Sequence, residues 1–521
     1  MIREIQIKIL PEFIHREDKI NQLIFEKLKV DPGRVRHFEL RKKSIDARGS
    51  RPFYLLRYDV FIDEDFIREP YVASQYKYVG ENPPVFIIGA GPAGYFAALE
   101  CLMVGLKPVV LERGKDVQAR RRDLKAIQQD GIVNPNSNYC FGEGGAGTYS
   151  DGKLYTRSHK RGSIDKVLRQ LVEHGAVPDI LTDAHPHIGS NKLPGIIAEI
   201  RKTILHFGGE VRFDTEVTDI VISNHKVEAI KTKNGDIIPA KYVVVATGHS
   251  SRGIFQILAN QKIQIEAKDF ALGLRIEHPQ SFIDFVQYRQ SKREEGLPAA
   301  SYAVVAQVEN CGVFSFCMCP GGLVVPAATA PGEIVVNGMS ISRRDSPFAN
   351  SGFVTSISVA ELEKHGYKGV FASLDFQRDV ERSMFNAGDG TQKAPAQRVC
   401  DFVDGKLSGM LNPTSYIPGL ISSPLHEILP SFVYQRLRGG LIQIDKKMKG
   451  YVTNQANIIG VESRTSSPVK IPRDADTLMH KDAYGLFPCG EGAGYAGGIL
   501  SAAMDGQKII RAIKKVIERE F

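Results

Sequence analysis

Three glycines with the spacing of a nucleotide-binding turn, Gly89, Gly91 and Gly94, follow the apolar run "VFII" and precede a stretch with helical periodicity. In a strand–turn–helix unit the first glycine permits the tight turn, the second admits a pyrophosphate close to backbone N–H groups, and the third lets helix and strand pack closely. The start of the helix also favours an anion. The sequence therefore predicts a dinucleotide site at this turn, which further contains Ala90, Pro92 and Ala93.

A polar position, Glu112, ends the next expected strand in "PVVLERG" and is followed by Arg113. A carboxylate there can accept hydrogen bonds from the hydroxyls of an adenosine ribose, and it disfavours a ribose that carries a 2′-phosphate. NAD and FAD both satisfy this description. These residues alone therefore predict a dinucleotide with an unphosphorylated ribose, without deciding between the two.

Three further segments have the composition of loops that join the same site. "CFGEGGAGTYSDGKL" is too rich in glycine for a core and rich in hydroxyl and carboxylate groups, "VVVATG" ends a strand, and "PCGEGAGYAGGI" lies far downstream. Glycine-rich backbone suits close approach to a flat ring or a phosphate. The expected contacts are Gly144, Gly145, Thr148, Ser150, Asp151, Gly152, Lys153, Ala246, Thr247, Gly248, Gly490, Gly497, Gly498 and Ile499.

Stretches spread over most of the chain resemble a bacterial family of FAD-dependent dehydrogenases within the glutathione-reductase-like FAD-binding superfamily. Among them are "VFIIGAGPAGYFAALECL", "FGEGGAGTYSDGKL", "FSFCMCPGG" and "PCGEGAGYAGGILSAAMDG". The resemblance implies that the cofactor is FAD and that the protein is an oxidoreductase transferring a hydride to or from an organic substrate. The glycine turn would then hold the ADP half of FAD, and the loops around Gly145 and Gly498 the flavin half.

The resemblance also implies roles for single residues. Glu491 corresponds to an acidic residue that bonds the ribityl chain and phosphate of FAD, although many relatives have the shorter Asp there. The backbone of Val217 corresponds to the contact with the adenine edge. Arg120 or Arg121 could face the pyrophosphate, and a solvated helix face is an equal alternative for both.

The elements that must position these residues fall into three expected regions. Period-two alternation over residues 2–10, 35–40 and 54–62 and a helical stripe over residues 18–29 predict a βαββ unit of ferredoxin-like type within residues 1–78. Residues 85–264 and 471–521 are expected to form an α/β FAD-binding domain of Rossmann type, glutathione-reductase-like by resemblance. Residues 265–470 contain more strand-like runs and are expected to form an inserted, mainly-β (α+β) substrate domain.

Local signals place helices and turns inside the α/β region. A helix is expected over residues 93–104 with Gly105 after its end, another over residues 164–174 capped by Ser163, and a third over residues 195–207 with Pro194 in its first turn. Hairpin turns are expected at Asn224-His225 and Asn234-Gly235. A long final helix follows the glycine loop near Gly498.

Composition is that of an ordinary globular chain. Among its 521 residues, 67 basic and 59 acidic side chains leave a formal charge of +8, and 43% of residues are hydrophobic. No apolar run has the length of a signal peptide or a membrane span, so a cytoplasmic protein is expected. Nucleic acid is an unfavoured partner, although one basic hairpin could dock RNA; a solvated strand edge is the favoured interpretation of Arg34, Arg36, Arg41, Lys42, Lys43, Arg48 and Arg51.

Candidates on the substrate side each have a plainer alternative. The seven cysteines include no C-x-x-C pair, and Cys317 and Cys319 are better explained as small strand residues than as a redox pair. His185 and His187 could exchange protons or cap a loop, and Arg343 and Arg344 could bind an anion or pair at the surface. No spacing of these residues suits a metal.

A second glycine turn of the kind that binds a nicotinamide dinucleotide is missing from the sequence. No dedicated NAD(P) domain is therefore expected, and transient NAD(P)H, another electron partner or the small-molecule substrate itself would exchange electrons with the flavin. Flavin chemistry needs orientation and electrostatics more than particular side chains. The sequence consequently identifies no catalytic residue, and a non-enzymatic protein that has kept the fold is the remaining alternative.

Overall fold

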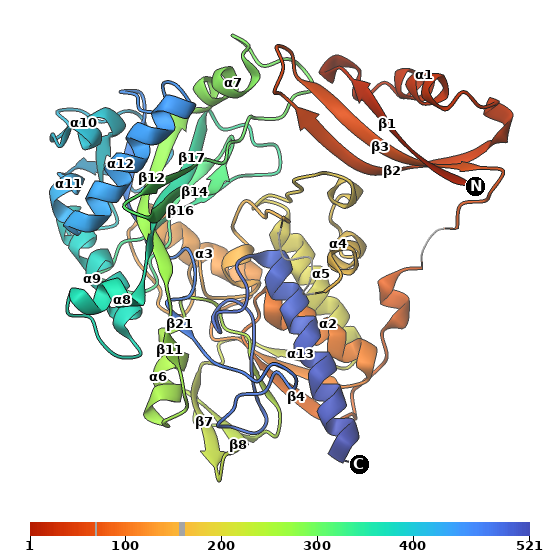
Figure 1. Cartoon of the computed structure of the whole chain (residues 1–521). Helices are drawn as coiled ribbons and strands as arrows, with labels where there is room; N and C mark the ends of the chain where they lie inside the picture. Colours follow the sequence, from red (N-terminus) through yellow and green to blue (C-terminus); the bar gives the residue numbers. More distant parts are fainter. Residues whose placement is uncertain (68–69, 156–161, 521) are drawn as a thin grey trace.

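A parallel sheet joins short strands that lie far apart in the sequence (Figure 1). The structure is a computed structural model that describes residues 1–67, 70–155 and 162–520. The five strands follow the order β22-β10-β4-β5-β6, and all neighbouring pairs are parallel. They are β4 (Pro84–Ile88), β5 (Lys107–Leu111), β6 (Glu210–Arg212), β10 (Val243–Val245) and β22 (Leu486–Pro488). The central strands are almost wholly apolar, as is normal for a parallel sheet covered on both faces.

Helices cover one face of this sheet, and a small antiparallel sheet covers the other. The helical face carries α2 (Pro92–Val104), α4 (Ile164–Glu173), α5 (Leu193–His206) and α13 (Ile499–Glu520). The other face carries β7 (Val217–Ser223), β8 (Lys226–Thr232), β9 (Ile237–Pro239) and α6 (Arg252–Asn260). This is the mixed α/β architecture of Rossmann type that the sequence predicts.

Local sequence signals set the ends of several elements. Gly105 takes a left-handed φ of 75° directly after α2, and the Ser163 hydroxyl accepts a hydrogen bond from Lys166 N at the start of α4. Asn224 and His225, with φ of 48° and 60°, form the expected turn between β7 and β8. Asp116 caps α3 (Val117–Gln129) by accepting from two backbone N–H groups of its first turn.

A seven-stranded, mostly antiparallel sheet forms the second large layer, in the order β13-β14-β17-β12-β20-β18-β19. Its strands are β12 (Phe270–Pro279), β13 (Val305–Val308), β14 (Cys311–Cys319), β17 (Phe348–Ile357), β18 (Ala394–Arg398), β19 (Leu420–Ser422) and β20 (Asn457–Glu462). The helices beside it are α7 (Gln280–Tyr288), α8 (Val359–Lys364), α9 (Ala372–Ala387), α10 (Val399–Asp404), α11 (Leu425–Ile428) and α12 (Ser431–Lys447). A hairpin-like pair, β15 (Leu323–Pro326) and β16 (Val336–Met339), forms a separate two-stranded sheet that packs against the seven strands.

Two short strands connect the layers. The chain passes toward the seven-stranded sheet through β11 (Glu266–Ala267) and returns through β21 (Val469–Lys470). These strands pair antiparallel with each other, Glu266 opposite Lys470, and Figure 1 shows them between the two layers. Both passages of the chain therefore lie side by side.

The N-terminal unit consists of β1 (Ile2–Ile9), α1 (Glu17–Leu28), β2 (Val35–Asp46) and β3 (Phe53–Ile62), with the strands in the order β1-β3-β2. Strand β2 is longer than expected, because its pairing with β3 continues to Asp46. The buried apolar residues of this unit belong to the same hydrophobic cluster as those of the seven-stranded sheet. The Tyr54 hydroxyl also donates to Gly296 O at 2.7 Å, so the unit is fastened to the region beyond β12.

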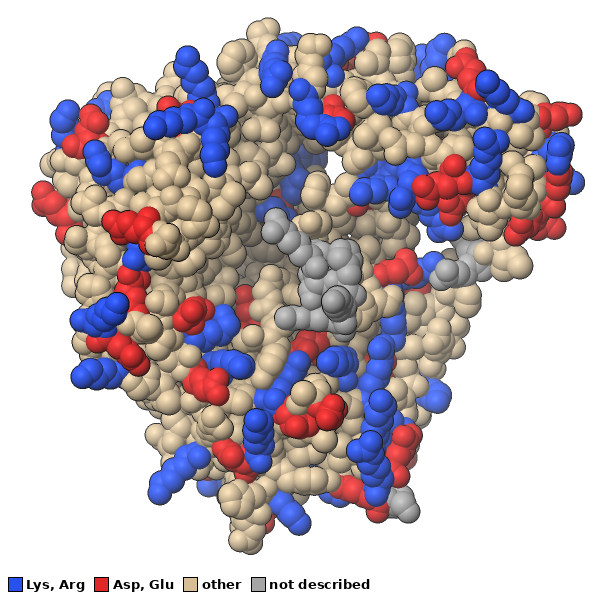
Figure 2. All heavy atoms as spheres, viewed as in Figure 1, with Lys and Arg blue, Asp and Glu red and all other residues tan. Residues whose placement is uncertain are grey.

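The basic side chains of the N-terminal hairpin are mostly paired with acids. Ion pairs join Arg34 to Asp63, Arg41 to Asp59, Lys43 to Asp179 and Asp183, Arg48 to Asp46, and Arg51 to Glu12 and Glu294. Figure 2 shows acidic groups among the basic ones over this unit. The pairing favours the interpretation as a solvated strand edge. Within the described ranges, no helix is both long and apolar enough to span a membrane.

Candidate functional site

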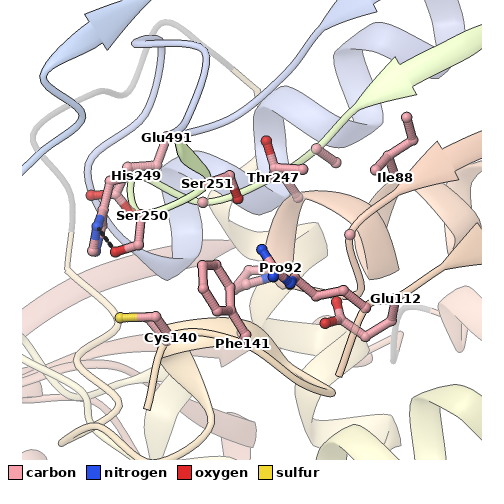
Figure 3. A pocket seen from close by; sticks show the side chains of 18 of the residues that line it. Ile88, Pro92, Glu112, Cys140, Phe141, Thr247, His249, Ser250, Ser251 and Glu491 are labelled. Atoms are coloured by element: carbon pink, nitrogen blue, oxygen red, sulfur yellow. Dashed lines mark hydrogen bonds between the residues drawn. The ribbon is translucent and has the colours of Figure 1, made fainter. Parts of the chain in front are cut away.

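A cavity opens at the carboxyl ends of the parallel strands, the usual place for a ligand in such a sheet (Figure 3). It contains about 1290 Å³ of space, including its open mouth. The expected site residues that line it are Gly89, Gly91, Pro92, Ala93, Glu112, Arg113, Gly145, Ser150, Val217, Ala246, Thr247, Gly248, Glu491, Gly498 and Ile499. The fold thus brings together six segments that lie far apart in the sequence.

The three glycines of the turn have different surroundings. A Cβ atom on Gly94 would lie 1.9 Å from Gly89 O, and one on Gly89 would lie 2.9 Å from Ala246 O. A Cβ on Gly91 would meet only Gly145 Cα, at 4.0 Å. Gly89 and Gly94 are therefore required for backbone packing, and Gly91 leaves its backbone open to the cavity. Ala90 and Gly94 lie outside the lining.

The buried Glu112 carboxylate holds three loops as well as lining the cavity. Its oxygens accept hydrogen bonds from Ala90 N at 2.9 Å, Gly114 N at 2.9 Å and Gly142 N at 3.0 Å. A carboxylate has about four lone-pair sites, so acceptor capacity remains for ribose hydroxyls. Figure 3 places Glu112 at one side of the cavity and Glu491 at the other.

Arg113 is fixed beside the glycine turn by two polar partners and one ring. Its Nη2 donates to Asn136 Oδ1 at 2.6 Å and to Glu216 Oε1 at 2.9 Å, and its guanidinium lies 4.5 Å from the centre of the Phe141 ring. Its buried Nε has no hydrogen-bond partner among the described residues. Glu216 and Phe141 also line the cavity, so this cluster forms a polar and aromatic wall near Val217.

Arg120 is neither solvated nor part of the cavity lining, which differs from both sequence expectations. It is fully buried, and its guanidinium donates to Asn138 O, Glu143 O and Gly145 O at 2.8–2.9 Å. It therefore fixes the path of the glycine-rich loop. Gly144 and Thr148 act within the same loop, because Gly144 N donates to Ala90 O and Thr148 Oγ1 donates to Glu143 O.

The last part of that loop turns away from the cavity toward the seven-stranded sheet. The buried Asp151 carboxylate accepts from Arg344 Nη2 at 2.6 Å and from the Ser340 hydroxyl, while Lys153 lies beside two cysteines. Gly152 has a φ of 70°, and a Cβ there would meet the Leu193 side chain at 2.7 Å. Asp151, Gly152 and Lys153, expected to contact the cofactor, are thus absent from the lining.

The other substrate-side candidates have separate environments. His187 hydrogen bonds with Ser342 O at 3.2 Å, and burial lowers its pKa. His185 contacts Tyr155 edge to face. Arg343 is exposed and pairs with Asp345, whereas Arg344 pairs with Asp151, so the two arginines do not form a common anion site.

The C-terminal glycine loop brings the start of α13 to the cavity. Gly498, Ile499 and Ala502 line it, and the first turn of a helix presents unpaired N–H groups with partial positive charge. Gly490 N donates to Asp505 Oδ2 at 2.8 Å, and Gly497 N donates to Ser501 Oγ at 3.1 Å. Gly490 and Gly497 therefore shape the loop and lie outside the lining.

Several lining residues were not expected from the sequence: Ile88, Leu111, Cys140, Phe141, Ala146, Gly147, Thr215, Glu216, His249, Ser250, Ser251, Gly253, Ile254 and Ala502. The polar run "HSS" directly after the strand-ending "ATG" was a signal for three of them. His249 Nδ1 and Ser250 Oγ hydrogen bond at 2.8 Å (Figure 3). Burial and the nearby Arg464 charge lower the pKa of His249 to about 4, so its ring is neutral at physiological pH.

A buried ion-pair network lies behind His249 and joins the two large layers. Arg252, in α6, pairs with Glu333 at 2.6 Å and with Glu381 at 2.8 Å, and Arg464 pairs with the same two carboxylates. Breaking one member of such a network leaves buried charges without partners, which is strongly destabilising. The network consequently fixes this side of the cavity.

Besides Arg113, Thr247 and Glu491 offer polar groups to a ligand. Thr247 Oγ1 is buried and has no hydrogen-bond partner among the described residues, which is rare unless a ligand or water supplies one. Burial raises the pKa of Glu491 to about 7, and the Lys268 charge opposes that shift. In the part of the chain that the structure describes, no group of three or more His, Cys, Asp or Glu side chains is arranged to hold a metal ion.

Comparisons with known proteins identify relatives over most of the chain. The family described as pyridine nucleotide-disulphide oxidoreductase matches residues 83–270, the C-terminal domain family of FAD-dependent proteins matches residues 269–465, and a domain of unknown function matches residues 1–61. A Clostridium beijerinckii protein, named "Uncharacterized protein", is 39% identical over 95% of this chain and 96% of its own length.

Solved structures with a related chain path include a flavoprotein/dehydrogenase from Cytophaga hutchinsonii, 13% identical, covering 84% of this chain and 79% of its own, with a TM-score of 0.35. CtdE in complex with FAD is 12% identical, covers 84% of this chain and 89% of its own, and has a TM-score of 0.33. At such TM-scores these two likenesses carry no inference about the reaction.

Proposed function

The chain belongs to the FAD-dependent oxidoreductases, and we propose that it uses tightly bound FAD to transfer a hydride to or from a small organic substrate. The observation that carries the proposal is the cavity between Glu112 and the start of α13, because it offers separate groups for the two halves of FAD. When bound, FAD supplies the two-electron chemistry. The chain supplies binding, orientation and electrostatics.

The lining residues fit FAD at its adenosine diphosphate half. The open backbone at Gly91 and Ala93 would hold the pyrophosphate, Glu112 the ribose hydroxyls and the backbone of Val217 the adenine edge. The unpartnered Thr247 hydroxyl and Arg113 Nε are buried polar groups that this half of the ligand would satisfy. Such groups cost about 1–3 kcal/mol each when left unpaired.

The start of α13 would serve the flavin half. Two-electron reduction adds negative charge to the flavin, and the partial positive charge at a helix start stabilises charge that develops beside it. Gly498 and Ile499 line the cavity there, with no atom within 4 Å of the position of a Cβ on Gly498. We therefore assign these two residues to the flavin ring.

Glu491 is the group that we assign to proton exchange. With a pKa of about 7, raised mainly by burial, its carboxyl can release or take up a proton near neutral pH. Hydride transfer to or from a carbon atom is normally accompanied by movement of a proton. The position of Glu491 in the cavity lining supports this assignment.

We further propose that the three expected regions keep separate roles. Residues 85–264 and 471–521 would bind FAD. Residues 265–470 would form the wall of the substrate side, and residues 1–78 would cover one end of residues 265–470. His249 lines the cavity, and the charges of Arg464 and Glu381 act on its pKa, which supports a substrate side that faces the seven-stranded sheet. Transient NAD(P)H or another electron partner would complete the reaction.

The test is to identify the cofactor and then to find what reduces it. Mass analysis of the denatured protein should show FAD, and FMN would contradict the assignment of the adenosine half. Anaerobic mixing with NADH, NADPH and a panel of alcohols, amines and organic acids should bleach the oxidised flavin with at least one of them. Two results together would contradict a redox role. No compound would reduce the bound flavin, and no acceptor would reoxidise the chemically reduced bound flavin faster than it reoxidises free reduced FAD.

A further inference from the structure

Three side chains from two distant segments meet outside the cavity lining, and the proposed hydride transfer uses none of them. Lys153 Nζ lies 3.6 Å from Cys317 Sγ and 3.8 Å from Cys319 Sγ. The Cys319 Sγ also lies 3.3 Å from Cys317 O, and the side chains of the two cysteines hydrogen bond to each other. A single ammonium group therefore faces two neighbouring sulfur atoms, both of them free thiols.

The backbone at Cys317 departs from a regular strand. Phe316 of β14 pairs with Gly352 of β17 and Cys319 pairs with Asn350, so two residues of β14 stand opposite one of β17. Cys317 takes a left-handed φ of 47° inside this bulge, a conformation that is strained for a residue other than glycine. Bulges often redirect a side chain next to an active site. The strained backbone conformation thus occurs at the residue whose sulfur faces Lys153.

Lys153 is held in place by its own backbone. It forms an isolated bridge with His187, and the flanking residues continue the pairing through Leu154 N to Pro186 O at 2.8 Å and Ile188 N to Gly152 O at 3.2 Å. These bonds leave the Lys153 side chain directed at β14. The position of its ammonium group is therefore built into the fold.

The surrounding charges favour one thiolate and one thiol. The hydrogen bond from Cys319 and the charges of Lys153 and Arg275 hold the pKa of Cys317 well below its ordinary value, against burial and the Asp151 charge. The pKa of Cys319 is raised by its bond to Cys317 and by burial. Two further carboxylates, Glu462 and Glu491, are near enough for the Cys317 charge to raise their pKa values, and Arg275 is paired with the first at 2.7 Å.

The thiol pair lies near the cavity without being part of its lining. Ser150, in the same loop as Lys153, lines the cavity, and the Cys317 charge raises the pKa of Glu491, which also lines it.

We propose that Cys317 and Cys319 form a redox-active dithiol that exchanges two electrons with bound FAD. On oxidation a bond forms between the two sulfur atoms, and the S–H bond of Cys319 breaks. Both electrons and the Cys319 proton pass to FAD, so the negative charge of the Cys317 thiolate is conserved as the charge of reduced FAD. The proposal rests on FAD binding and is independent of the organic substrate.

The sequence spacing favours a labile disulfide over a structural one. Two cysteines separated by a single residue close a very small ring when their sulfur atoms bond, which strains the disulfide. Strained disulfides have more oxidising potentials and are the regulatory or catalytic ones. The close spacing that argues against a permanent bond is thus compatible with a reversible one.

Counting electrons tests the proposal directly. The full-length holoenzyme is mildly oxidised, its FAD content is measured, and it is titrated anaerobically with dithionite. We expect four electrons per FAD in the wild type and in Cys400→Ser, a control outside the pair, and two in Cys317→Ser and in Cys319→Ser. Two electrons in the wild type, or four in both variants of the pair, would overturn the assignment. Low FAD content would instead indicate failure of the cofactor site.

Alkylation of the reduced protein by iodoacetamide, mapped by mass spectrometry, gives a readout that needs no turnover. Because the thiolate is the nucleophile, a thiol that is already ionised reacts at a rate that is flat between pH 6.5 and 8.5, whereas an ordinary thiol gains nearly 10-fold per unit. We expect a flat profile for Cys317 in the wild type and in Lys153→Arg, and a rising one in Lys153→Met. A rising profile in the wild type would contradict the Lys153-paired thiolate.

Discussion

Replacing Gly91 by Ala isolates the contact between the glycine turn and the pyrophosphate. Gly91 has φ −77° and ψ −174°, a conformation that alanine adopts without strain. The added Cβ would have one neighbour, Gly145 Cα at 4.0 Å, which is ordinary contact. The variant should therefore fold, with an unfolding free energy equal to that of the wild type or higher by up to about 1 kcal/mol through the loss of unfolded-state freedom.

The cost should appear in cofactor affinity instead. The new methyl group would stand where the pyrophosphate approaches the backbone, so at least one charge-assisted N–H bond would be lost. Such a bond contributes about 1.5–3 kcal/mol, equivalent to a Kd for FAD that is about 10- to 150-fold higher. The affinity is measured by titrating the apo protein with FAD, and the unfolding free energy is measured in urea on the same preparation.

Gly94→Ala is the matched control, because it adds the same methyl group to the same turn. Its Cβ would lie 1.9 Å from Gly89 O, a backbone atom that cannot move without opening the turn. This variant should lose stability or fail to fold, in contrast to Gly91→Ala. Wild-type affinity for FAD in a folded Gly91→Ala protein would refute the reasoning that Gly91 faces the pyrophosphate.

Three other expectations concern single side chains. Thr247→Val removes a buried hydroxyl without a partner, so the apo protein should be as stable as the wild type while the Kd for FAD rises about 2- to 13-fold, measured by the same titration. The pKa of Glu491 is raised from 4.5 to about 7, so the folded chain binds this proton more tightly than the unfolded one, and the resulting stability is complete below pH 4.5 and lost as the pH rises through 7. Between pH 5 and pH 8 the free energy of unfolding in urea should fall further for the apo wild type than for apo Glu491→Gln, by at most about 3 kcal/mol. An equal fall in both proteins would contradict the raised pKa. Tyr54→Phe removes the bond to Gly296 O and should lower the unfolding free energy by about 0.5–1.5 kcal/mol in one calorimetric transition; a separate early transition would show that the N-terminal unit unfolds alone.

Local chemistry explains what the sequence could predict. The requirement for glycine at Gly89 and Gly94, the cap at Ser163 and the turn at Asn224 each depend on neighbours within a few residues or on one adjacent strand. Glu112 and Thr247 were also expected to lie together, because strand ends in a parallel sheet meet at one edge, and both line the cavity. Such features leave a pattern in the sequence itself.

Features that depend on distant partners left no such pattern. Composition could not show that the loop containing Ser150 turns away from the cavity before Asp151, whose partner Arg344 is almost two hundred positions away. Arg120 was expected on a surface or facing phosphate, and its burial follows from carbonyl groups that only the folded loop presents. Lys153 meets Cys317 for the same kind of reason.

The pairing of β11 with β21 bears on how a chain like this can be assembled or re-engineered. The intervening segment leaves and rejoins the α/β layer at one hydrogen-bonded pair, Ala267 opposite Val469, so a short turn could close the gap without separating the parallel strands. Segments with adjacent ends are those that exchange between proteins as modules. Arg252 would have to change with the excised module, because both of its carboxylate partners, Glu333 and Glu381, would leave with it.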